Sequence, residues 1–449
     1  MTEMIATSNR RAVIGAGITG RSVARFLKSR EIPFDWYDTR DELQDADIDS
    51  ALRLGEISDN QLVGYDELIV SPGIAKSESY LAAAEAAGSK IVGDIEIFAR
   101  QVEAPVAAIT GSNGKTTVTS LLAEVAKACG VNAVAAGNLG EPVLDQLDRD
   151  YDLFVLELSS FQLETTNSLR SEVAVILNIS PDHMDRYDSM ISYHAAKQRI
   201  HTGAVTVISN RDDLLTQPMI ADSQQHKSFG LDQPDLGHYG IRKKQSEQYV
   251  AYGLEILFPL SQMKLQGEHN LANAMVVLAM ADALGLDRDT AIEVICQFSG
   301  LPHRCELIAE NKNIRWVNDS KATNTGATIA AINSMTGLTE KSGSQQSKLI
   351  LIAGGQTKNQ DFRDFAEIAS KKVKHFILLG EGAALLADAI GSPASIFHVE
   401  NMQEAVYRAQ EITESGDCVL LSPACASFDQ FASYQDRGNQ FRECVEALN

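Results

Sequence analysis

The residues best suited to chemistry lie in a glycine-rich stretch at 108–117, AITGSNGKTT. Its glycines let backbone N–H groups converge on phosphate, and the following helix N-terminus adds positive potential. Lys115 can reach the β- and γ-phosphates, and Thr116 carries a hydroxyl suited to Mg²⁺. Ile109 stands where the usual phosphate loop has its first glycine. The stretch predicts ATP binding by Gly111, Ser112, Asn113, Gly114, Lys115, Thr116 and Thr117.

A second glycine-rich loop, GAGITG at 15–20, follows an apolar strand and opens a helix. The next predicted strand is followed by Asp38, about 20 residues later, where dinucleotide-binding folds place the acid that binds ribose. This pattern indicates a diphosphate-bearing nucleotide but does not identify it. From the residues alone it is compatible with NAD(P), with another nucleotide diphosphate or with an unliganded turn.

Three further residues could serve the ATP loop. Glu157 ends the apolar segment 151–157, where a nucleotide-binding sheet places a carboxylate for Mg²⁺. His183 follows the apolar segment 173–177 and is a candidate metal ligand or acid–base group at the same edge. Lys197 lies one helix further, where a solvated lysine is the ordinary expectation. A solvated strand end for Glu157, and a helix cap or core position for His183, stay open.

Similar polar clusters lie beside apolar segments in the last third of the chain. The cluster at 302–304 (PHR) precedes a predicted strand, and those at 318–324 (NDSKATN), 353–358 (AGGQTK) and 422–429 (SPACASFD) follow apolar segments. Cationic and hydroxyl side chains at successive strand ends suit a substrate that carries carboxylates. Each residue alone is also compatible with ordinary loop chemistry.

Short apolar runs alternate with amphipathic helices, a pattern typical of parallel α/β layers. Two polar segments, 221–248 and 336–348, predict irregular surface loops. A length of 449 residues favours about three domains, and we place them at 1–96, 97–300 and 301–449. The predicted strands are 12–14, 34–37, 68–70, 106–110, 153–158, 173–177, 205–209, 349–352, 376–379 and 419–421, and the predicted helices are 19–29, 115–129, 270–284 and 361–371.

The charge balance limits the possible partners. The chain has 39 basic and 60 acidic side chains, a formal net charge of −21, which repels nucleic-acid phosphates and anionic lipids. It has six scattered cysteines, no signal sequence and no apolar stretch of about 20 residues. We therefore expect a soluble cytoplasmic protein that holds any anionic ligand by local groups.

Taken together, these segments resemble the Mur ligase family over nearly the whole chain. SSFQLE and SPACAS resemble the branch that adds D-glutamate. The matching segments are TGSNGKTT (110–117), GN (137–138), ELSSFQLE (157–164), NISPDHMDRY (178–187), HAAKQRI (194–200), GEHN (267–270), GLPHR (300–304), NDSKATN (318–324) and SPACASFDQF (422–431).

The resemblance implies three α/β domains: a Rossmann-like N-terminal domain, a central domain with a P-loop ATPase-type parallel sheet, and a Rossmann-like C-terminal domain. It implies an ATP-dependent ligase that adds D-glutamate to UDP-N-acetylmuramoyl-L-alanine through an acyl phosphate, in cytoplasmic peptidoglycan precursor synthesis. The implied cofactors are ATP and two Mg²⁺ ions. The implied partners are these small molecules, without nucleic acid or membrane, and the chain would be a monomer.

Other classes of protein stay as alternatives. Another Mur ligase or a folylpolyglutamate synthetase would keep the fold and change the amino acid or acceptor. An NAD-dependent oxidoreductase would use the loop at 15–20, but no second catalytic cluster lies near that loop in the sequence. An ATP-driven motor or switch would need an arginine finger, which we cannot identify.

The resemblance also implies site residues by matching position. Lys115, His183 and Lys197 would be catalytic. Lys197 would be a carbamate, because a free ammonium cannot bind a cation. Thr116 and Glu157 would hold the first Mg²⁺, and His183 and Lys197 the second. Tyr434 departs from the family, which usually has another aromatic residue there. ATP would contact Asn270, Arg304 and Asp319; D-glutamate would contact Thr323, Lys358, Ser427 and Phe428; and the uridine-linked substrate would contact Ile18, Thr19, Asp38, Thr39, Arg40, Ser71, Gly73, Asn138, Ser159 and Gln162.

Overall fold

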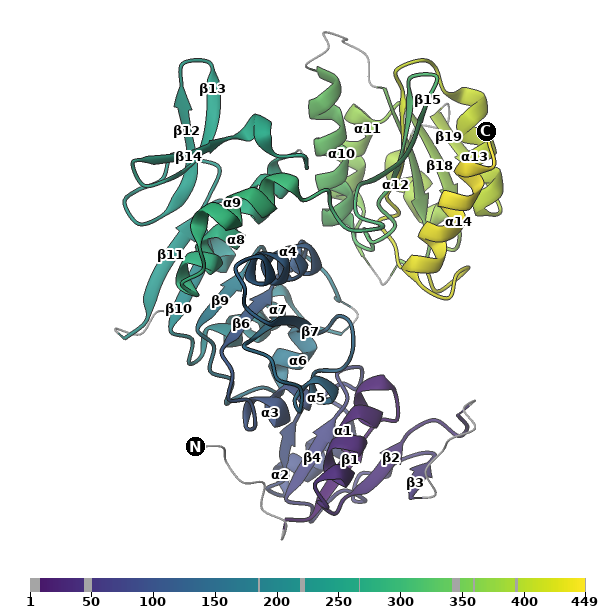
Figure 1. Ribbon diagram of the computed structural model, residues 1–449. Coiled ribbons are helices and arrows are strands. Elements are labelled where there is room, and N and C mark those ends of the chain that lie inside the picture. Colours follow the sequence, from purple (N-terminus) through teal and green to yellow (C-terminus); the bar gives the residue numbers. More distant parts are fainter. Residues whose placement is uncertain are drawn as a thin grey trace. The chain divides into compact units, whose positions relative to one another are not determined.

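The structure is a computed structural model that describes residues 9–43, 51–184, 186–218, 223–265, 267–340, 348–357, 360–391 and 395–448. It is mixed α/β, as the sequence predicts (Figure 1). The chain forms two compact units. The first comprises Met1–Ile179, Ile191–Phe258 and Ala274–Ile295, and the second comprises Ser180–Met190, Pro259–Asn273 and Cys296–Asn449. The domain boundaries after residues 96 and 300 stay predictions.

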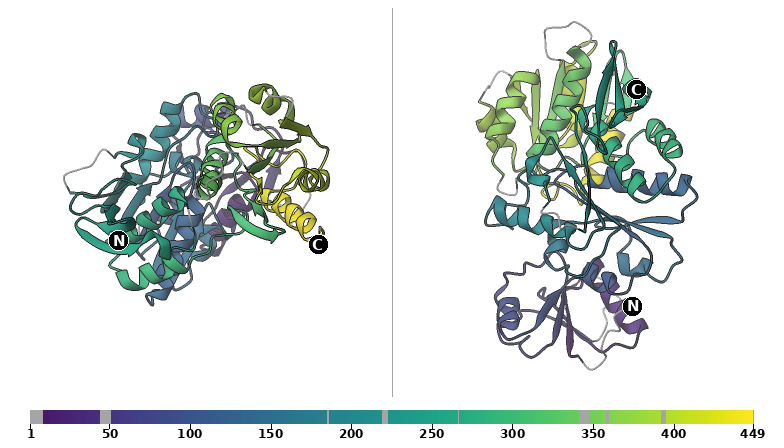
Figure 2. Two further views of the ribbon diagram at one scale, coloured as in Figure 1. Left: turned by 90° about the horizontal axis from the view of Figure 1, so that it is seen from above. Right: turned by 90° about the vertical axis from the view of Figure 1, so that its left-hand side faces the viewer.

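A five-stranded parallel sheet begins the first unit, in the order β3-β2-β1-β4-β5. Its central strand is entirely buried, because helices α1 and α2 cover opposite faces of the sheet (Figure 2). The elements are β1 (Arg11–Ile14), α1 (Ile18–Ser29), β2 (Asp35–Asp38), β3 (Leu52–Leu54), β4 (Glu67–Val70), α2 (Ser79–Ala86), β5 (Lys90–Val92) and α3 (Asp94–Ala99).

A second parallel sheet in the same unit has six strands in the order β11-β10-β9-β6-β8-β7. Strand β6 lies between β9 and β8, so the loop after it opens at the middle of the sheet edge. The elements are β6 (Val106–Thr110), α4 (Lys115–Ala128), β7 (Ala133–Gly137), α5 (Val143–Gln146), β8 (Leu153–Glu157), α6 (Ser160–Glu164), β9 (Val173–Ile176), α7 (Met190–Gln198), η1 (Arg199–His201), β10 (Thr206–Asn210), η2 (Leu214–Thr216) and β11 (Gln225–Phe229).

The prediction of an irregular segment at 221–248 is wrong. Strand β11 pairs with β10, and β12 (Tyr239–Lys244) opens a small sheet with β13 (Glu247–Tyr252) and β14 (Glu255–Pro259). Both β11 and β12 bury only part of their length, so their polar residues give no strong apolar signal. Helices α8 (Glu268–Ala283) and α9 (Arg288–Gln297) follow, after η3 (Leu260–Gln262).

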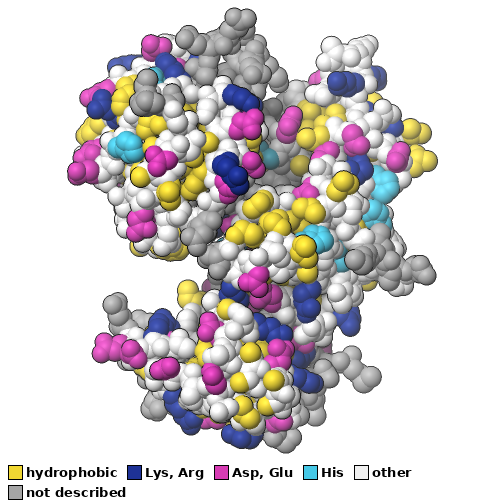
Figure 3. All heavy atoms as spheres, turned by 180° about the vertical axis from the view of Figure 1, so that it is seen from behind, with side chains coloured by type: hydrophobic (Ala, Val, Ile, Leu, Met, Phe, Trp, Pro, Cys, Tyr) yellow, Lys and Arg dark blue, Asp and Glu magenta, His cyan; other side chains and the backbone are white. Residues whose placement is uncertain are grey.

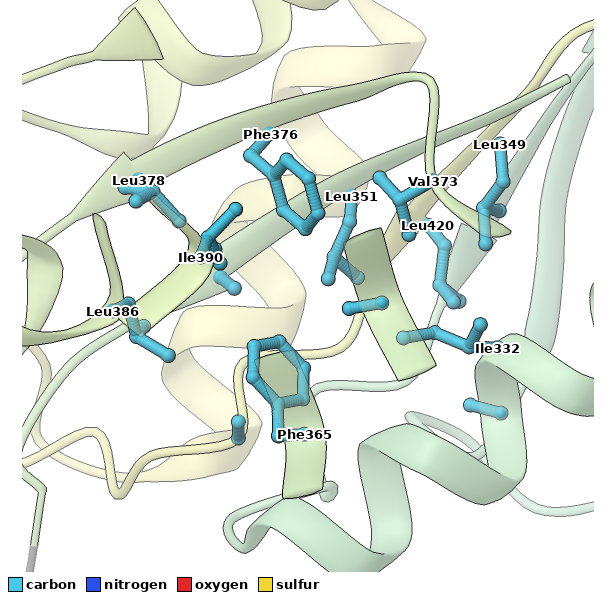
Figure 4. Close-up of a cluster of buried hydrophobic side chains, with 14 of the residues drawn as sticks. Ile332, Leu349, Leu351, Phe365, Val373, Phe376, Leu378, Leu386, Ile390 and Leu420 are labelled. Atoms are coloured by element: carbon cyan, nitrogen blue, oxygen red, sulfur yellow. The ribbon is translucent and has the colours of Figure 1, made fainter. Parts of the chain in front are cut away.

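The C-terminal sheet has the order β15-β16-β20-β17-β18-β19, in which only β15 is antiparallel to its neighbour. Leu351 and Phe376 belong to the core on one face, beside helix residue Phe365 (Figure 4), and Ile350 and Phe441 to the core on the other. The elements are β15 (Glu306–Asn311), β16 (Ile314–Asn318), α10 (Thr325–Glu340), β17 (Leu349–Gly354), α11 (Arg363–Lys372), β18 (His375–Leu379), α12 (Ala383–Ile390), β19 (Ile396–His398), α13 (Met402–Ile412), β20 (Cys418–Leu421) and α14 (Tyr434–Glu446).

Two further predictions concern loops and surface. Helix α10 continues to Glu340, so the prediction of a loop is wrong for residues 336–340, and residues 341–347 lie outside the described part. Within the described residues, no helix is both long and apolar enough to cross a membrane. On the face drawn in Figure 3, lysine and arginine side chains are dispersed among acidic ones.

Candidate active site

The glycine-rich loop at 111–114 connects the buried strand β6 to helix α4. Gly114 has φ +84°, a left-handed conformation that favours glycine, and it brings the chain into the first turn of the helix. Asn178, which follows β9, fixes the loop from the neighbouring strand. Its Oδ1 accepts from the Asn113 N–H at 2.8 Å, and its backbone oxygen accepts from the Ser112 N–H at 2.9 Å. The loop is therefore rigidly supported at the sheet edge.

Lys115 lies over this loop. Its Nζ donates to the backbone oxygens of Gly111 at 2.8 Å and Ser112 at 2.9 Å. Thr116 and Thr117 follow in the first turn of α4, at the positive end of the helix dipole. This is the arrangement in which backbone N–H groups, an ammonium and hydroxyls hold a polyphosphate.

Glu157 lies beside the loop because β8 pairs with β6 in register, with Glu157 opposite Ile109. It is only 3% exposed. Its Oε1 accepts from Asn138 Nδ2 at 3.0 Å, whereas its Oε2 is buried and has no hydrogen-bond partner within the described chain. Since a buried carboxylate oxygen needs a donor or a cation, this position fits a divalent metal ion next to the phosphate loop. The alternative of a solvated strand-end acid is wrong.

Lys197 is buried in α7 and is only 2% exposed, so the ordinary expectation of a solvated lysine is wrong. Its Nζ donates to the Gly111 backbone oxygen at 3.0 Å, lies 3.5 Å from Thr110 Oγ1, and is 4.7 Å from the centre of the Tyr193 ring. Lys197, on helix α7, therefore contacts the same phosphate loop as Lys115, which lies on helix α4.

Ser159 and Gln162 begin helix α6, two residues after β8. They form a reciprocal cap in which Ser159 Oγ accepts from the Gln162 N–H at 3.2 Å and Gln162 Oε1 accepts from the Ser159 N–H at 3.1 Å. Together with Asn138 and Glu157, they place a polar group at the sheet edge. The sequence residues predicted for the phosphate loop, its acid and this edge thus lie together.

The second glycine loop caps the N-terminal sheet. A Cβ on Gly20 would lie 2.0 Å from the Gly15 backbone oxygen, so this turn requires glycine at that position. Asp38 accepts from the Ala16 N–H at 2.6 Å and from Arg40 Nε and Nη2, each at 2.8 Å. Burial alone would raise the pKa of Asp38, but these hydrogen bonds outweigh it and hold the pKa below its usual value.

Both oxygens of Asp38 therefore have donors within the chain, which counts against a role as the free ribose acceptor of an NAD site. Ser71 contributes a buried hydroxyl to the same turn, at the position a Gly15 side chain would occupy. Ile18, Thr39, Arg40 and Gly73 are exposed around it, and Thr19 is half-buried. The predicted uridine-nucleotide contacts at this loop thus surround one turn.

In the second unit, His183 interacts with the neighbouring carboxylate of Asp182. The backbone N–H of His183, a residue with φ +57°, donates to Asp182 Oδ1 at 2.9 Å, and its Nε2 lies 3.6 Å from Asp182 Oδ2. Asn324 Nδ2 donates to Asp182 at 3.0 Å. The imidazole is 34% exposed and lies outside the helices, so it is neither a helix cap nor a core residue. Its approach to Glu157 and Lys197, which belong to the first unit, stays a prediction.

Arg304 and Asp319 lie close together in this unit. Asp319 accepts from Ser422 Oγ at 2.8 Å and from the Cys305 N–H at 3.2 Å, and burial raises its pKa to about 7. Asn270 is buried at the start of α8. These residues remain the predicted nucleotide contacts of the second unit.

The residues predicted to hold an amino acid have contrasting exposures. Ser427 is 2% exposed, whereas Phe428 next to it is 69% exposed. Thr323 is half-buried, and Tyr434 lies at the start of α14 with Lys321 Nζ 4.1 Å from its ring centre. Lys358 lies outside the described residues.

The sequence patterns did not identify Arg437, although it joins two of the predicted loops. It is 1% exposed and donates to Ser320 Oγ at 3.0 Å, to the Ser320 backbone oxygen at 2.8 Å and to the backbone oxygens of Cys425 and Ala426. Burial lowers its pKa to about 10. Charged side chains on a helix such as α14 ordinarily indicate a face exposed to solvent. No signal in the sequence therefore shows that Arg437 is buried.

A phosphate loop beside a buried acid in a parallel sheet defines an α/β nucleotide-binding protein. Three family models match the chain: the Mur ligase MurD-like N-terminal domain at 9–93, the Mur ligase middle domain at 109–281, and the Mur ligase glutamate ligase domain at 303–425. The chain belongs to the Mur ligase family.

Whole-length relatives include three proteins called UDP-N-acetylmuramoylalanine--D-glutamate ligase. The one from Pseudomonas syringae is 45% identical over 99% of this chain and 100% of the relative. Those from Hahella chejuensis and Pseudomonas aeruginosa are 44% and 43% identical, over 97% and 99% of this chain and 98% and 99% of theirs.

Solved structures show the same fold at lower identity. A MurF ligase from Thermotoga maritima in complex with ADP has a TM-score of 0.63 at 15% identity, over 99% of this chain and 100% of that chain. The MurC ligase of the same organism has a TM-score of 0.61 at 19% identity, over 98% and 100%. The predicted α/β architecture of a Mur ligase is thereby confirmed.

Proposed function

We propose that the chain joins D-glutamate to the alanine carboxylate of UDP-N-acetylmuramoyl-L-alanine, with cleavage of ATP to ADP and phosphate, in cytoplasmic peptidoglycan precursor synthesis. The observation that carries this proposal is the 43–45% identity, over nearly the whole chain, to proteins named for that reaction. The phosphate loop and the acid beside it support the ATP-dependent step.

The reaction has two steps. A carboxylate oxygen of the acceptor attacks the γ-phosphorus of ATP, and ADP leaves. The amine of D-glutamate then attacks the acyl carbon, and phosphate leaves through a tetrahedral intermediate. Lys115, with the N–H groups of the loop at 111–114, would stabilise the charge that moves between the phosphoryl oxygens.

Two metal sites belong to the proposal. Thr116 and Glu157 would hold one Mg²⁺, which is supported by the unpaired buried Oε2 of Glu157. His183 and Lys197 would hold a second, with Lys197 as a carbamate whose oxygens replace the ammonium as donors. When bound, the ions neutralise the phosphate charge. The chain's own part, within the first unit, is to hold Thr116, Glu157 and Lys197 around the phosphate loop.

Three groups of residues would hold the substrates, as the family resemblance implies. The uridine nucleotide would bind over the first glycine loop, and the muramoyl-alanine arm would contact Asn138, Ser159 and Gln162. ATP would also contact Asn270, Arg304 and Asp319. D-Glutamate would contact Thr323, Lys358, Ser427 and Phe428, and its binding would cover the exposed Phe428 ring. We further propose that the protein acts as a cytoplasmic monomer without nucleic-acid or membrane partners.

An isotope-transfer experiment tests the acyl phosphate. The acceptor is prepared with ¹⁸O in both oxygens of its alanine carboxylate and turned over with ATP and D-glutamate. Because one carboxylate oxygen attacks the γ-phosphorus, we expect one ¹⁸O in each released phosphate and the other in the amide product, measured by mass spectrometry. Phosphate without ¹⁸O, or ¹⁸O in AMP, would rule out this chemistry.

A further inference from the structure

The segment that carries His183 makes a buried contact with Asn324, a residue to which none of the roles above is given. Ser180–Met190 follows strand β9 of the first unit in sequence, yet it belongs to the second unit. Within that unit, Asn324 Nδ2 donates to Asp182 Oδ2 at 3.0 Å, and the two residues are 4% and 7% exposed. Because the acceptor is a carboxylate shielded from water, this hydrogen bond is stronger than one between neutral groups.

Asp182 in turn fixes the backbone turn at His183. Its Oδ1 accepts from the His183 N–H at 2.9 Å, while its Oδ2 lies 3.6 Å from His183 Nε2. His183 has φ +57°, a left-handed conformation that a non-glycine residue rarely adopts, so Asp182 helps to hold a backbone that is otherwise disfavoured. A metal-binding histidine usually has a carboxylate beside its ring. The arrangement therefore fits the metal role proposed for His183.

Asn324 also caps helix α10, which begins at Thr325. Its Oδ1 accepts from the Ala327 N–H at 2.8 Å, and its backbone oxygen accepts from the Thr328 N–H at 3.3 Å. The amide oxygen thus holds the helix, and the amide nitrogen holds Asp182. If the amide turned over, its oxygen would face a carboxylate and its nitrogen a backbone N–H. Asn324 therefore fixes Asp182 relative to the start of α10.

The first turn of α10 also holds the two loops predicted to bind the amino acid, which follow β17 and β20. Thr328 Oγ1 accepts from the Ala424 N–H at 3.0 Å, and the Thr325 N–H donates to Gln360 Oε1 at 3.0 Å. Gln360 Nε2 donates in turn to the backbone oxygens of Thr357 at 3.0 Å and Ala424 at 3.2 Å. The helix turn, both loops and Asp182 are therefore joined by hydrogen bonds within one unit.

We infer that Asn324 is a positioning residue that couples His183 to the amino-acid loops, so that D-glutamate and a divalent cation at His183 bind cooperatively. The inference rests on the proposed function, because it takes D-glutamate as the ligand of these loops and His183 as a metal ligand. A ligand that orders the loops steadies α10 and, through Asn324 and Asp182, the turn at His183. The coupling is reciprocal, since each ligand must raise the affinity of the other by the same factor.

Kinetics separate this role from capping. Asn324→Ser keeps a hydroxyl that can cap α10, but it has no N–H group to donate to Asp182. It should raise both the KM for D-glutamate and the activation constant for free Mg²⁺ about 10-fold, the lower end of the usual range for groups that support a metal ligand, with the KM for ATP and the melting temperature nearly unchanged.

Asn401→Ser is the matched control. Asn401 is an exposed asparagine that caps α13 in the same unit, where its Oδ1 accepts from the Glu404 N–H at 3.0 Å. Its replacement should leave both constants unchanged. If Asn324→Ser behaved like Asn401→Ser, or if both variants raised the two constants equally, the inference would be overturned.

A second measurement does not depend on turnover. Mn²⁺ is titrated into protein with labelled histidine, in the presence of ADP and the acceptor, and broadening of the His183 signal, assigned with His183→Gln, is followed by NMR. D-Glutamate should lower the Mn²⁺ concentration for half-broadening about 10-fold in the wild type and have no effect in Asn324→Ser. Broadening that no amino acid changes would overturn the inference. A shift produced by L-lysine and not by D-glutamate would leave the coupling intact and contradict the proposed function instead.

Discussion

Replacing Lys115 with alanine is expected to lower turnover by about 100- to 1,000-fold, the scale of loss when a preorganised charge-stabilising group is removed. Its ammonium lies within 2.9 Å of two backbone oxygens of the phosphate loop, so it is already held where the transferring phosphoryl group would lie. Because the charge it balances is largest in the transition state, kcat should fall more than the KM for ATP rises. Steady-state phosphate release measures both.

Lys127→Ala is the matched control. Lys127 is exposed in the last turn of the same helix, so its removal tests whether losing any α4 lysine disturbs the fold. The control should keep its full rate and melting temperature. If Lys115→Ala also kept its turnover, the phosphate loop would have no part in the reaction.

Replacing Lys197 is expected to lower turnover by at least about 100-fold, provided that its carbamate supplies metal-binding oxygens. Carbamylation joins the neutral Lys197 amine to CO₂ and releases one proton. The buried position beside Gly111 and Tyr193 shields such a group from water. Incubation with ¹³C-bicarbonate should give a carbamate signal in the wild-type protein and none in Lys197→Met.

The choice of variant separates chemistry from packing. Lys197→Met keeps most of the buried volume, so a folded but inactive Lys197→Met enzyme points to the lost nitrogen. Lys197→Ala leaves space in which an added small carboxylate could bind. We expect partial recovery of turnover with such a carboxylate in Lys197→Ala and none in Lys197→Met. Full activity of either variant without additive would contradict the carbamate role.

The fold was largely predictable because its central strands are continuous apolar runs. Strands such as β6 and β17 are buried along their whole length, so they carry a strong signal. The strands β3, β5 and β19 have three residues each and were not predicted. Strand β11 was missed for a different reason, since an edge strand with one buried end can be polar.

The site was predictable where backbone geometry and chemistry coincide. The loop at 111–114 and Glu157 follow from the spacing of residues around two strands. Burial is the property that the residues alone did not reveal: Lys197, which is ordinarily expected to be a solvated lysine, is 2% exposed and contacts the phosphate loop. Arg437 was missed for the same reason, because it acts through contacts with residues far away in the sequence.

The net charge of −21 describes the surface and not the binding sites. ATP, the uridine nucleotide and D-glutamate are all anions, so each must be captured locally against the overall field. The loop at 111–114 provides N–H groups and Lys115 for this purpose. Arg40 and Arg304 are further cations among the predicted contacts.

A panel of acceptors and amino acids tests the central claim most directly. The purified protein is given ATP and Mg²⁺ with each pair drawn from UDP-N-acetylmuramate, UDP-N-acetylmuramoyl-L-alanine and a folate acceptor, and from D-glutamate, L-glutamate, L-lysine and meso-diaminopimelate. Phosphate release and product mass are then measured. We predict equal amounts of ADP, phosphate and amide product only for UDP-N-acetylmuramoyl-L-alanine with D-glutamate. Full turnover with L-lysine, meso-diaminopimelate or a folate acceptor, or ATP cleavage without either substrate, would contradict the proposed function.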